Sequence, residues 1–99
     1  MDALPVEERT GLPYASKRQG VMHACGHDLH TCTGLGVARL LASLPALKAR
    51  VRLLFQPAEE LAQGAVWMRE AGATKGLDAL FGIHVVPNLL AGIVGIRRG

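Results

Sequence analysis

The amino-acid sequence predicts an α/β fold in which helices flank part of a mixed, largely parallel sheet. Two stretches, residues 31–43 and 60–72, repeat apolar side chains at helical spacing. Three others, residues 50–57, 77–86 and 91–99, are short and rich in apolar or strand-forming residues. Helices and strands that alternate along a chain usually build parallel strands covered by helices. We therefore expect one α/β layer.

Residues 1–24 precede these elements and are expected to form a loop. Pro5, Gly11, Pro13 and Gly20 interrupt the segment, and no regular spacing of apolar residues survives between them. A stretch of about 20 residues without secondary structure is unusual in a compact domain and is often functional.

The two predicted helices each carry one apolar face. Its members are Val37, Leu40, Leu41 and Leu44 in the first helix and Leu61, Ala65 and Met68 in the second. Pro45 ends the first helix, because proline cannot continue a helix. Gly72, a residue type common just after helix C-termini, ends the second.

The strands are expected to bring polar residues together. Segment 77–86 is almost continuously apolar, as in a strand that is covered on both faces. Glu59 and Glu60 follow segment 50–57, and His84 lies toward the end of segment 77–86. In open α/β sheets, functional sites form at the carboxyl ends of the strands. These three side chains are therefore expected to meet there, beside the histidine-rich segment that precedes the first helix.

The composition limits the classes of partner. With 49% hydrophobic residues and a mean hydropathy of +0.24, the 99-residue chain is apolar for its length, because small domains keep much of their surface in water. We expect it to bury part of that surface against something that it does not contain. The net charge is only +3 and no basic run exceeds Arg97–Arg98, so no nucleic-acid partner is expected.

The sequence carries no signal for a membrane or for secretion. No apolar run approaches the roughly 20 residues that a membrane span requires, so no membrane partner is expected. The N-terminus contains Asp2, Glu7 and Glu8 and has no apolar segment of the kind found in secretion signals. A cytoplasmic location is therefore expected. In that reducing compartment, a cysteine near histidines indicates a metal ligand or a nucleophile before it indicates a disulfide.

The stretch MHACGHDLHTC is dense in side chains that bind metals. The thiolate of Cys25 and the imidazole of His27 flank a small glycine and can turn toward one metal cluster. Two such residues alone are equally consistent with a buried thiol beside a solvated histidine. For His23 and His30, a role near the metal, a place at the helix start and plain surface all stay open. Cys32 falls on the predicted helix and is expected to be a small core residue.

The adjacent carboxylates of Glu59 and Glu60 point in different directions on an extended chain. One can bind a metal while the other accepts a proton from a water molecule that the metal has made more acidic. The alternative is a pair of exposed acids at the start of the second helix, stabilised by the helix dipole. His84 alone would more often be a core histidine than a ligand. Asp2 is a candidate for orienting a ligating histidine by accepting its free N–H group.

Six blocks of the sequence resemble one enzyme family in their order and approximate spacing. They are MDALP, GLPYAS, GVMHACGHDLHT, FQPAEE, GA…M…AGA and GIHVVPNLLAGIVGIRRG. The family is the aminoacylase-like metallopeptidases, in particular the branch with hippurate hydrolase, bacterial N-acyl-amino-acid amidohydrolases and plant auxin-conjugate hydrolases. The resemblance covers essentially the whole chain, and the CGHD and QPAEE blocks are specific when they occur together.

The resemblance implies an amidohydrolase with two divalent metal ions that cleaves the amide bond between an acyl group and an amino acid. Four ligand positions match this chain, namely Cys25, His27, Glu60 and His84. Glu59 matches the general base that later protonates the leaving amine. Asp2 matches a position that supports the ligands without touching the metal. Zinc suits this mixed set of thiolate, imidazole and carboxylate, and manganese, cobalt or nickel are compatible with it.

The same resemblance implies a longer protein. In this family a smaller lid or dimerisation domain interrupts the catalytic domain, and the complete enzyme is expected to be a homodimer. Residues 1–99 match the central part of the metallopeptidase catalytic domain, which makes this an incomplete zinc-peptidase-like domain. The lid and the C-terminal part, with one further histidine ligand, are expected to be absent. The expected substrate is a small N-acyl amino acid, and the isolated chain is expected to self-associate.

Alternatives of other classes stay open at this point. The chain could be a truncated, inactive fragment that folds or docks without turnover, which an activity assay on the purified 99-residue chain would reveal. It could also be a small structural zinc module built from Cys25, Cys32 and nearby histidines, which would need neither Glu59 nor His84. A phosphohydrolase built on the dipeptide His27–Asp28 is the weakest of these alternatives.

Overall fold

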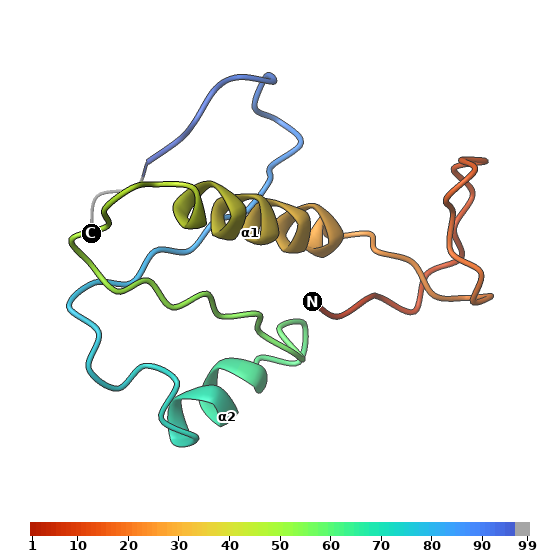
Figure 1. The fold of residues 1–99 in the computed structure, drawn as a ribbon. Coiled ribbons are helices and arrows are strands. Elements are labelled where there is room, and N and C mark those ends of the chain that lie inside the picture. The colour runs from red at the N-terminus through yellow and green to blue at the C-terminus, as the bar shows by residue number, and fades with distance from the viewer. Residues whose placement is uncertain (97–99) are drawn as a thin grey trace.

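The computed structural model describes residues 1–96, and two helices are the regular elements of this part of the chain. Helix α1 spans His27–Ala42 and helix α2 spans Gly64–Glu70. In Figure 1, two long segments without helix, residues 51–56 and 77–86, run between α1 and α2. The radius of gyration is 15.9 Å, above the roughly 13 Å of a compact domain of this length, so the arrangement is open.

The predicted strands are not formed, and this part of the prediction is wrong for the described chain. Segments 50–57 and 77–86 exchange no backbone hydrogen bonds with each other, and residues 1–96 contain no strand. A strand requires hydrogen bonds to a neighbour, whereas an apolar pattern reports only the surroundings that the side chains favour. The predicted segment 91–99 extends beyond the described residues, and its described part also contains no strand.

Helix α1 confirms the first predicted helix but starts earlier, at His27 rather than residue 31. Gly26 precedes it in the left-handed conformation, with φ of 79°, which costs a glycine little because it has no side chain. Asp28 lies in the first turn, where its negative charge interacts favourably with the positive end of the helix dipole. The early start places His27 on the helix, where its orientation is fixed.

Helix α2 is shorter than predicted, because a turn occupies residues 58–63. Ala58 and Ala62 adopt left-handed backbone conformations, with φ of 45° and 53°. The N–H of Ala62 donates to the carbonyl of Glu59 at 2.8 Å, which closes the turn. Left-handed backbone costs a non-glycine residue of order 1–3 kcal/mol and is concentrated at functional sites. The turn carries Glu59 and Glu60, so the two carboxylates precede α2 and lie outside its first turn.

Residues 1–24 form a loop, as predicted. An antiparallel bridge between Leu4 and Met22 closes it at its base, and the rest extends as an arm away from the helices in Figure 1. Inside the arm, the carboxylate of Glu7 accepts the N–H of Gly20 at 2.7 Å, and that of Glu8 accepts the N–H of Ser16 at 2.8 Å. Because the bridge pairs Leu4 with Met22, the first residues of the chain lie beside the segment that enters α1.

Most side chains of the predicted apolar faces are exposed, in line with the expectation that this chain buries part of its apolar surface against something that it does not contain. Among residues 1–96 no hydrophobic side chain is buried, and His27 is the only buried polar one. Leu40 on α1 is 68% exposed, and Phe81, in the segment expected to be covered on both faces, is 90% exposed. The sequence pattern is that of buried elements, and nothing within the described residues covers them.

We expect the isolated 99-residue chain to associate with itself, because uncovered apolar faces are sites of association. Light scattering should show an average mass that rises with concentration. Phe81→Ser combined with Val94→Ser should reduce this rise, because both side chains are more than four-fifths exposed, at 90% and 82%. Tyr14→Ser is the matched control, because Tyr14 is also exposed but lies in the N-terminal arm. A wild-type chain that stays a monodisperse monomer would contradict the prediction.

Among the described residues, no helix is both long and apolar enough to span a membrane.

Candidate metal centre

Four separate segments meet at one place on the molecule. Asp2 comes from the start of the N-terminal loop, and Cys25 and His27 come from the entry into α1. The turn at residues 58–63 supplies two carboxylates, and the segment after α2 supplies His84. The structure therefore brings together all six residues that the sequence singled out, which are Asp2, Cys25, His27, Glu59, Glu60 and His84.

His27 stands at the centre of this cluster and is only 5% exposed. Its Nδ1 lies 2.9 Å from the backbone carbonyl of Asp2, which can only accept a hydrogen bond, so the ring proton is assigned to Nδ1. Its Nε2 therefore carries a free lone pair. This atom lies 3.5 Å from Oε2 of Glu59 and 3.8 Å from Oε1 of Glu60. A histidine held in this way presents one nitrogen to a metal ion.

Cys25 and His84 form the second contact of the cluster. The Cys25 Sγ and the His84 Nε2 are 3.5 Å apart. The Nδ1 of His84 donates to the backbone carbonyl of Val85 at 2.6 Å, so here too Nε2 carries the free lone pair. Burial raises the pKa of the Cys25 thiol, and the carboxylates of Glu60, Glu59 and Asp2 raise it further. The thiol thus lies in negatively charged surroundings, of the kind in which a cation is attracted.

Five of these six residues fall into two overlapping triads of donor atoms. Cys25, His27 and His84 form one, and His27, Glu59 and Glu60 form the other, with the ligand atoms of each triad within 4.8 Å of one another. Two donors of one tetrahedral zinc ion, bound at roughly 2.0–2.3 Å, are separated by roughly 3.3–3.8 Å. The contacts of 3.5 Å in both triads have this separation. The donor set therefore fits divalent metal ions in spacing and in chemistry.

Asp2 contacts the cluster differently from the expectation for a supporting carboxylate. The sequence suggested that its carboxylate accepts the free N–H of a histidine, but its main-chain carbonyl is the closer acceptor for His27. The carboxylate Oδ1 lies 3.4 Å from the same nitrogen, and Oδ2 accepts the N–H of Glu60 at 3.0 Å. That hydrogen bond is the main reason why the pKa of Asp2 lies well below its usual range. Asp2 thus ties the His27 ring to the turn that carries the glutamates.

Glu59 lies on the open side of the cluster. Its side chain is 50% exposed, against 28% for that of Glu60. The alternative of two acids at a helix start is contradicted, because the first turn of α2 contains no acidic residue. A half-exposed carboxylate beside the buried ring of His27 is accessible to water and to a small molecule.

Of the remaining histidines and the second cysteine, only His30 contacts a segment that carries a candidate ligand. His23 is exposed, and its ring makes no hydrogen bond within the described residues. Cys32 is exposed on α1 and belongs to neither triad, which contradicts both the core position and the structural zinc module. His30 accepts the N–H of Val85 at its Nε2, and burial is the first reason why its pKa is lowered. No sequence signal distinguished His30 from His23, because the role of His30 depends on a contact with the distant segment 77–86.

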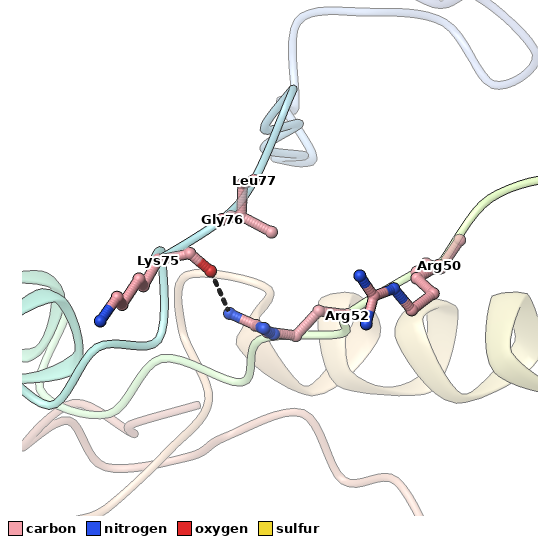
Figure 2. A pocket seen from close by; sticks show the side chains of 6 residues that line it. Arg50, Arg52, Lys75, Gly76 and Leu77 are labelled. Atoms are coloured by element: carbon pink, nitrogen blue, oxygen red, sulfur yellow. Dashed lines mark hydrogen bonds between the residues drawn. The ribbon is translucent and has the colours of Figure 1, made fainter.

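A separate cavity among the described residues lies away from this cluster. It has a volume of about 430 Å³ and is lined by Arg50, Val51, Arg52, Lys75, Gly76 and Leu77. Figure 2 shows the Arg52 guanidinium directed at the backbone carbonyl of Lys75, to which its Nη1 donates at 3.2 Å. None of the candidate metal ligands lines this cavity, so the candidate site is an exposed cluster and is separate from it.

Comparisons with known proteins give matches over the whole chain. The model of the peptidase family M20/M25/M40 matches residues 1–99. A probable hydrolase of Synechocystis sp. is 57% identical over 100 residues, which cover the whole of this chain and 25% of the relative. An N-acetyl-L-cysteine deacetylase of Bacillus subtilis is 54% identical over 100 residues, which again cover the whole chain and 24% of the relative.

The backbone of this chain also resembles that of a solved structure. A Bacillus subtilis protein, described as a dinuclear metal binding peptidase from the M20 family, superposes with a TM-score of 0.95 at 52% identity. The superposition covers 99% of this chain and 28% of that chain, and a peptidase neighbour is consistent with the α/β class. The chain spans about a quarter of the length of the curated relatives that it matches. Since the family model matches every residue, the resemblance to metallopeptidases is confirmed, and the chain belongs to the peptidase family M20/M25/M40.

Proposed function

We propose that the protein carrying this chain is a metal-dependent amidohydrolase that cleaves N-acyl amino acids. The observation that carries the proposal is the meeting of two triads of metal-binding side chains at His27, with a half-exposed glutamate beside them. The names of the relatives support it, since one is a dinuclear metal binding peptidase and another is an N-acetyl-L-cysteine deacetylase. A peptidase and an N-acetyl amino acid deacetylase both hydrolyse an amide bond, so the same metal-assisted reaction accounts for both.

In this proposal four side chains would hold the metal ions. Cys25 and His84 lie in one triad, Glu60 lies in the other, and His27 belongs to both. A pair of bound divalent cations supplies positive charge that polarises the scissile carbonyl and makes water more acidic. Zinc is the preferred ion for this donor set, and manganese, cobalt and nickel are compatible with it. Asp2 supports the site by holding the ring of His27 through its main-chain carbonyl.

Glu59 performs the proton transfers. Its carboxylate takes a proton from the attacking water, whose oxygen forms a bond to the acyl carbon. The amide C–N bond then breaks, and the same glutamate delivers the proton to the leaving nitrogen of the amino acid. The products are a carboxylic acid and a free amino acid, and Glu59 ends in its starting state. Its exposure on the open side of the cluster gives a substrate direct access to it.

The exposed apolar faces support a place for this chain within a larger domain. We propose that residues 1–99 are the central part of the catalytic domain, with extended segments that contribute strands to a mixed, largely parallel sheet. Phe81 and the neighbouring apolar side chains would then be covered by the rest of the domain. We further propose that the complete enzyme is a cytoplasmic homodimer with a lid domain that closes over the substrate.

The complete protein should release amino acid from N-acetyl amino acids, and a chelator should abolish the release. Dialysis against EDTA removes the ions, and the added divalent metal should restore activity, because the positive charge they supply is needed to activate water. Metal analysis of the active protein should give two ions per chain. Full activity after the metal has been removed, as verified by elemental analysis, would refute the proposal. Hydrolysis of dipeptides in place of N-acetyl amino acids would keep the mechanism and change the substrate.

A further inference from the structure

We propose that His30 is a positioning residue that holds the metal ligand His84 in place through the backbone of Val85. The Nε2 of His30 accepts the N–H of Val85 at 2.9 Å. Val85 directly follows His84, so this hydrogen bond fixes the backbone at the point where the ligand side chain departs. The inference rests on the proposed function, because it concerns how the metal site is kept in shape.

The contact matters because the segment that carries His84 has few others. Among the described residues, the carbonyl of Val86 accepts the N–H of the nearby Leu89, and the bond from Val85 to His30 is the only hydrogen bond that joins the backbone of residues 77–86 to a distant part of the chain. No strand pairing holds this segment there. The remaining polar contact is the one between the His84 and Cys25 side chains themselves. Without His30, the described chain offers no backbone anchor for this ligand.

Helix α1 gives His30 a fixed position from which to act. The N–H of His30 donates to the carbonyl of Gly26 at 3.0 Å, one turn before it, so the residue lies in the first turn of the helix. A side-chain carbon on Gly26 would clash with Val85 Cγ2 and lie 3.7 Å from His30 Nε2. Segment 77–86 therefore passes against the start of α1 at close range, and His30 is the group that bonds to it there.

His30 acts on the site without being a ligand itself. Its ring lies beside the ring of His84, with centroids 4.6 Å apart and planes inclined at 66°. Its Nε2 is already occupied by the N–H of Val85, and His30 belongs to neither triad of metal-binding side chains. Accepting an N–H requires the neutral ring with its proton on Nδ1. The edge-to-face contact and the hydrogen bond together fix both the backbone and the ring of His84.

The test compares two variants of His30 in the complete protein. His30→Leu keeps apolar bulk but removes the acceptor, so zinc affinity, measured by competition with a chromophoric chelator, should fall by about tenfold. His30→Gln should bind zinc nearly as well as the wild type, because its side-chain oxygen can reach the position of Nε2 and accept the same N–H. His23→Leu is the matched control and should leave the affinity unchanged, because the His23 ring is exposed. Thermal unfolding of each variant verifies that it is folded.

Hydrogen exchange on the metal-free protein separates the failure of this inference from the failure of the proposed function. The peptide that contains Val85 should exchange faster in His30→Leu than in the wild type, whether or not the protein binds zinc. Zinc affinity in His30→Leu equal to the wild type would overturn the inference, as would a His30→Gln variant as weak as His30→Leu. If the wild type binds no zinc, the proposed function fails, and unchanged exchange at Val85 overturns the inference on its own terms.

Discussion

Replacing Glu59 by glutamine in the complete protein is expected to lower kcat for hydrolysis of an N-acyl amino acid by about 10²–10⁴-fold, with the metal content nearly unchanged. Glutamine keeps the shape of glutamate but cannot take a proton from water or deliver one to the leaving amine. The Glu59 side chain is half exposed and contacts the cluster only at its edge, where Oε2 lies 3.5 Å from His27 Nε2. Its removal should therefore spare the ligands. Steady-state kinetics beside elemental analysis of the same preparation measures both quantities.

Its neighbour Glu60 provides the contrast. Glu60→Gln should lower the metal content first and the rate as a consequence, because a neutral amide is a poorer ligand for a dication than a carboxylate. Glu70→Gln on the exposed surface of α2 is the control and should change neither quantity. If Glu59→Gln loses metal while Glu60→Gln keeps both metal and rate, the two roles are reversed. If both variants keep full activity, the proton-transfer role assigned to Glu59 is wrong.

The meeting of the candidate ligands could be predicted from the sequence, although the structure achieves it by other means. The expectation rested on strand ends that meet at one edge of a sheet. In the described chain no sheet holds Cys25, Glu60 and His84 together. Hydrogen bonds between side chains and the backbone contribute to this instead, such as the one that the backbone N–H of Glu60 donates to the carboxylate of Asp2. The residue types were predictable because metals select them, whereas the connections between segments carry no local signature.

The start of α2 was mispredicted for a physical reason. Ala58 and Ala62 adopt left-handed backbone conformations, which normally point to glycine or asparagine. Alanine has the highest helix propensity, so the sequence around it favours helix. Only the closed turn around Glu59 and Glu60 overrides that preference. Because the same turn places Glu59 and Glu60 before α2, they are not acids of its first turn. The turn therefore explains both the wrong start of the predicted helix and the position of the two carboxylates beside His27.

The apolar patterns predicted surfaces that need cover, and the composition predicted that part of this cover lies outside the chain. Leu40 and Phe81 belong to stretches with the composition of buried elements, but both are exposed in the described chain. A pattern reports that a face needs cover and does not say which part of a protein supplies it. The chain covers about a quarter of its curated relatives, so most of each relative lies outside the matched part.

Replacing His27 should have the largest effect on metal binding, because both triads include this residue. His27→Ala is expected to weaken the binding of one ion by at least about 100-fold, because the single free nitrogen of the ring binds one ion and even partners outside the ligand set contribute about 10–100-fold. His84→Ala should weaken chiefly one ion, because His84 belongs to one triad only. Competition titrations with a chromophoric chelator, carried out on the complete protein, would resolve the two binding steps.

The comparison needs a variant that keeps the buried volume near His27, which is only 5% exposed. His27→Gln fills the space and can still donate to the carbonyl of Asp2 through its amide, but it lacks the imidazole nitrogen that faces Glu59 and Glu60. It should therefore fold like the wild type, as circular dichroism and thermal unfolding would report, and still lose one ion. His23→Gln is the control, because that ring is exposed and should bind no metal. A folded His27→Gln variant that retains two ions per chain would show that Nε2 of His27 is not a ligand, and the centre as described would be wrong.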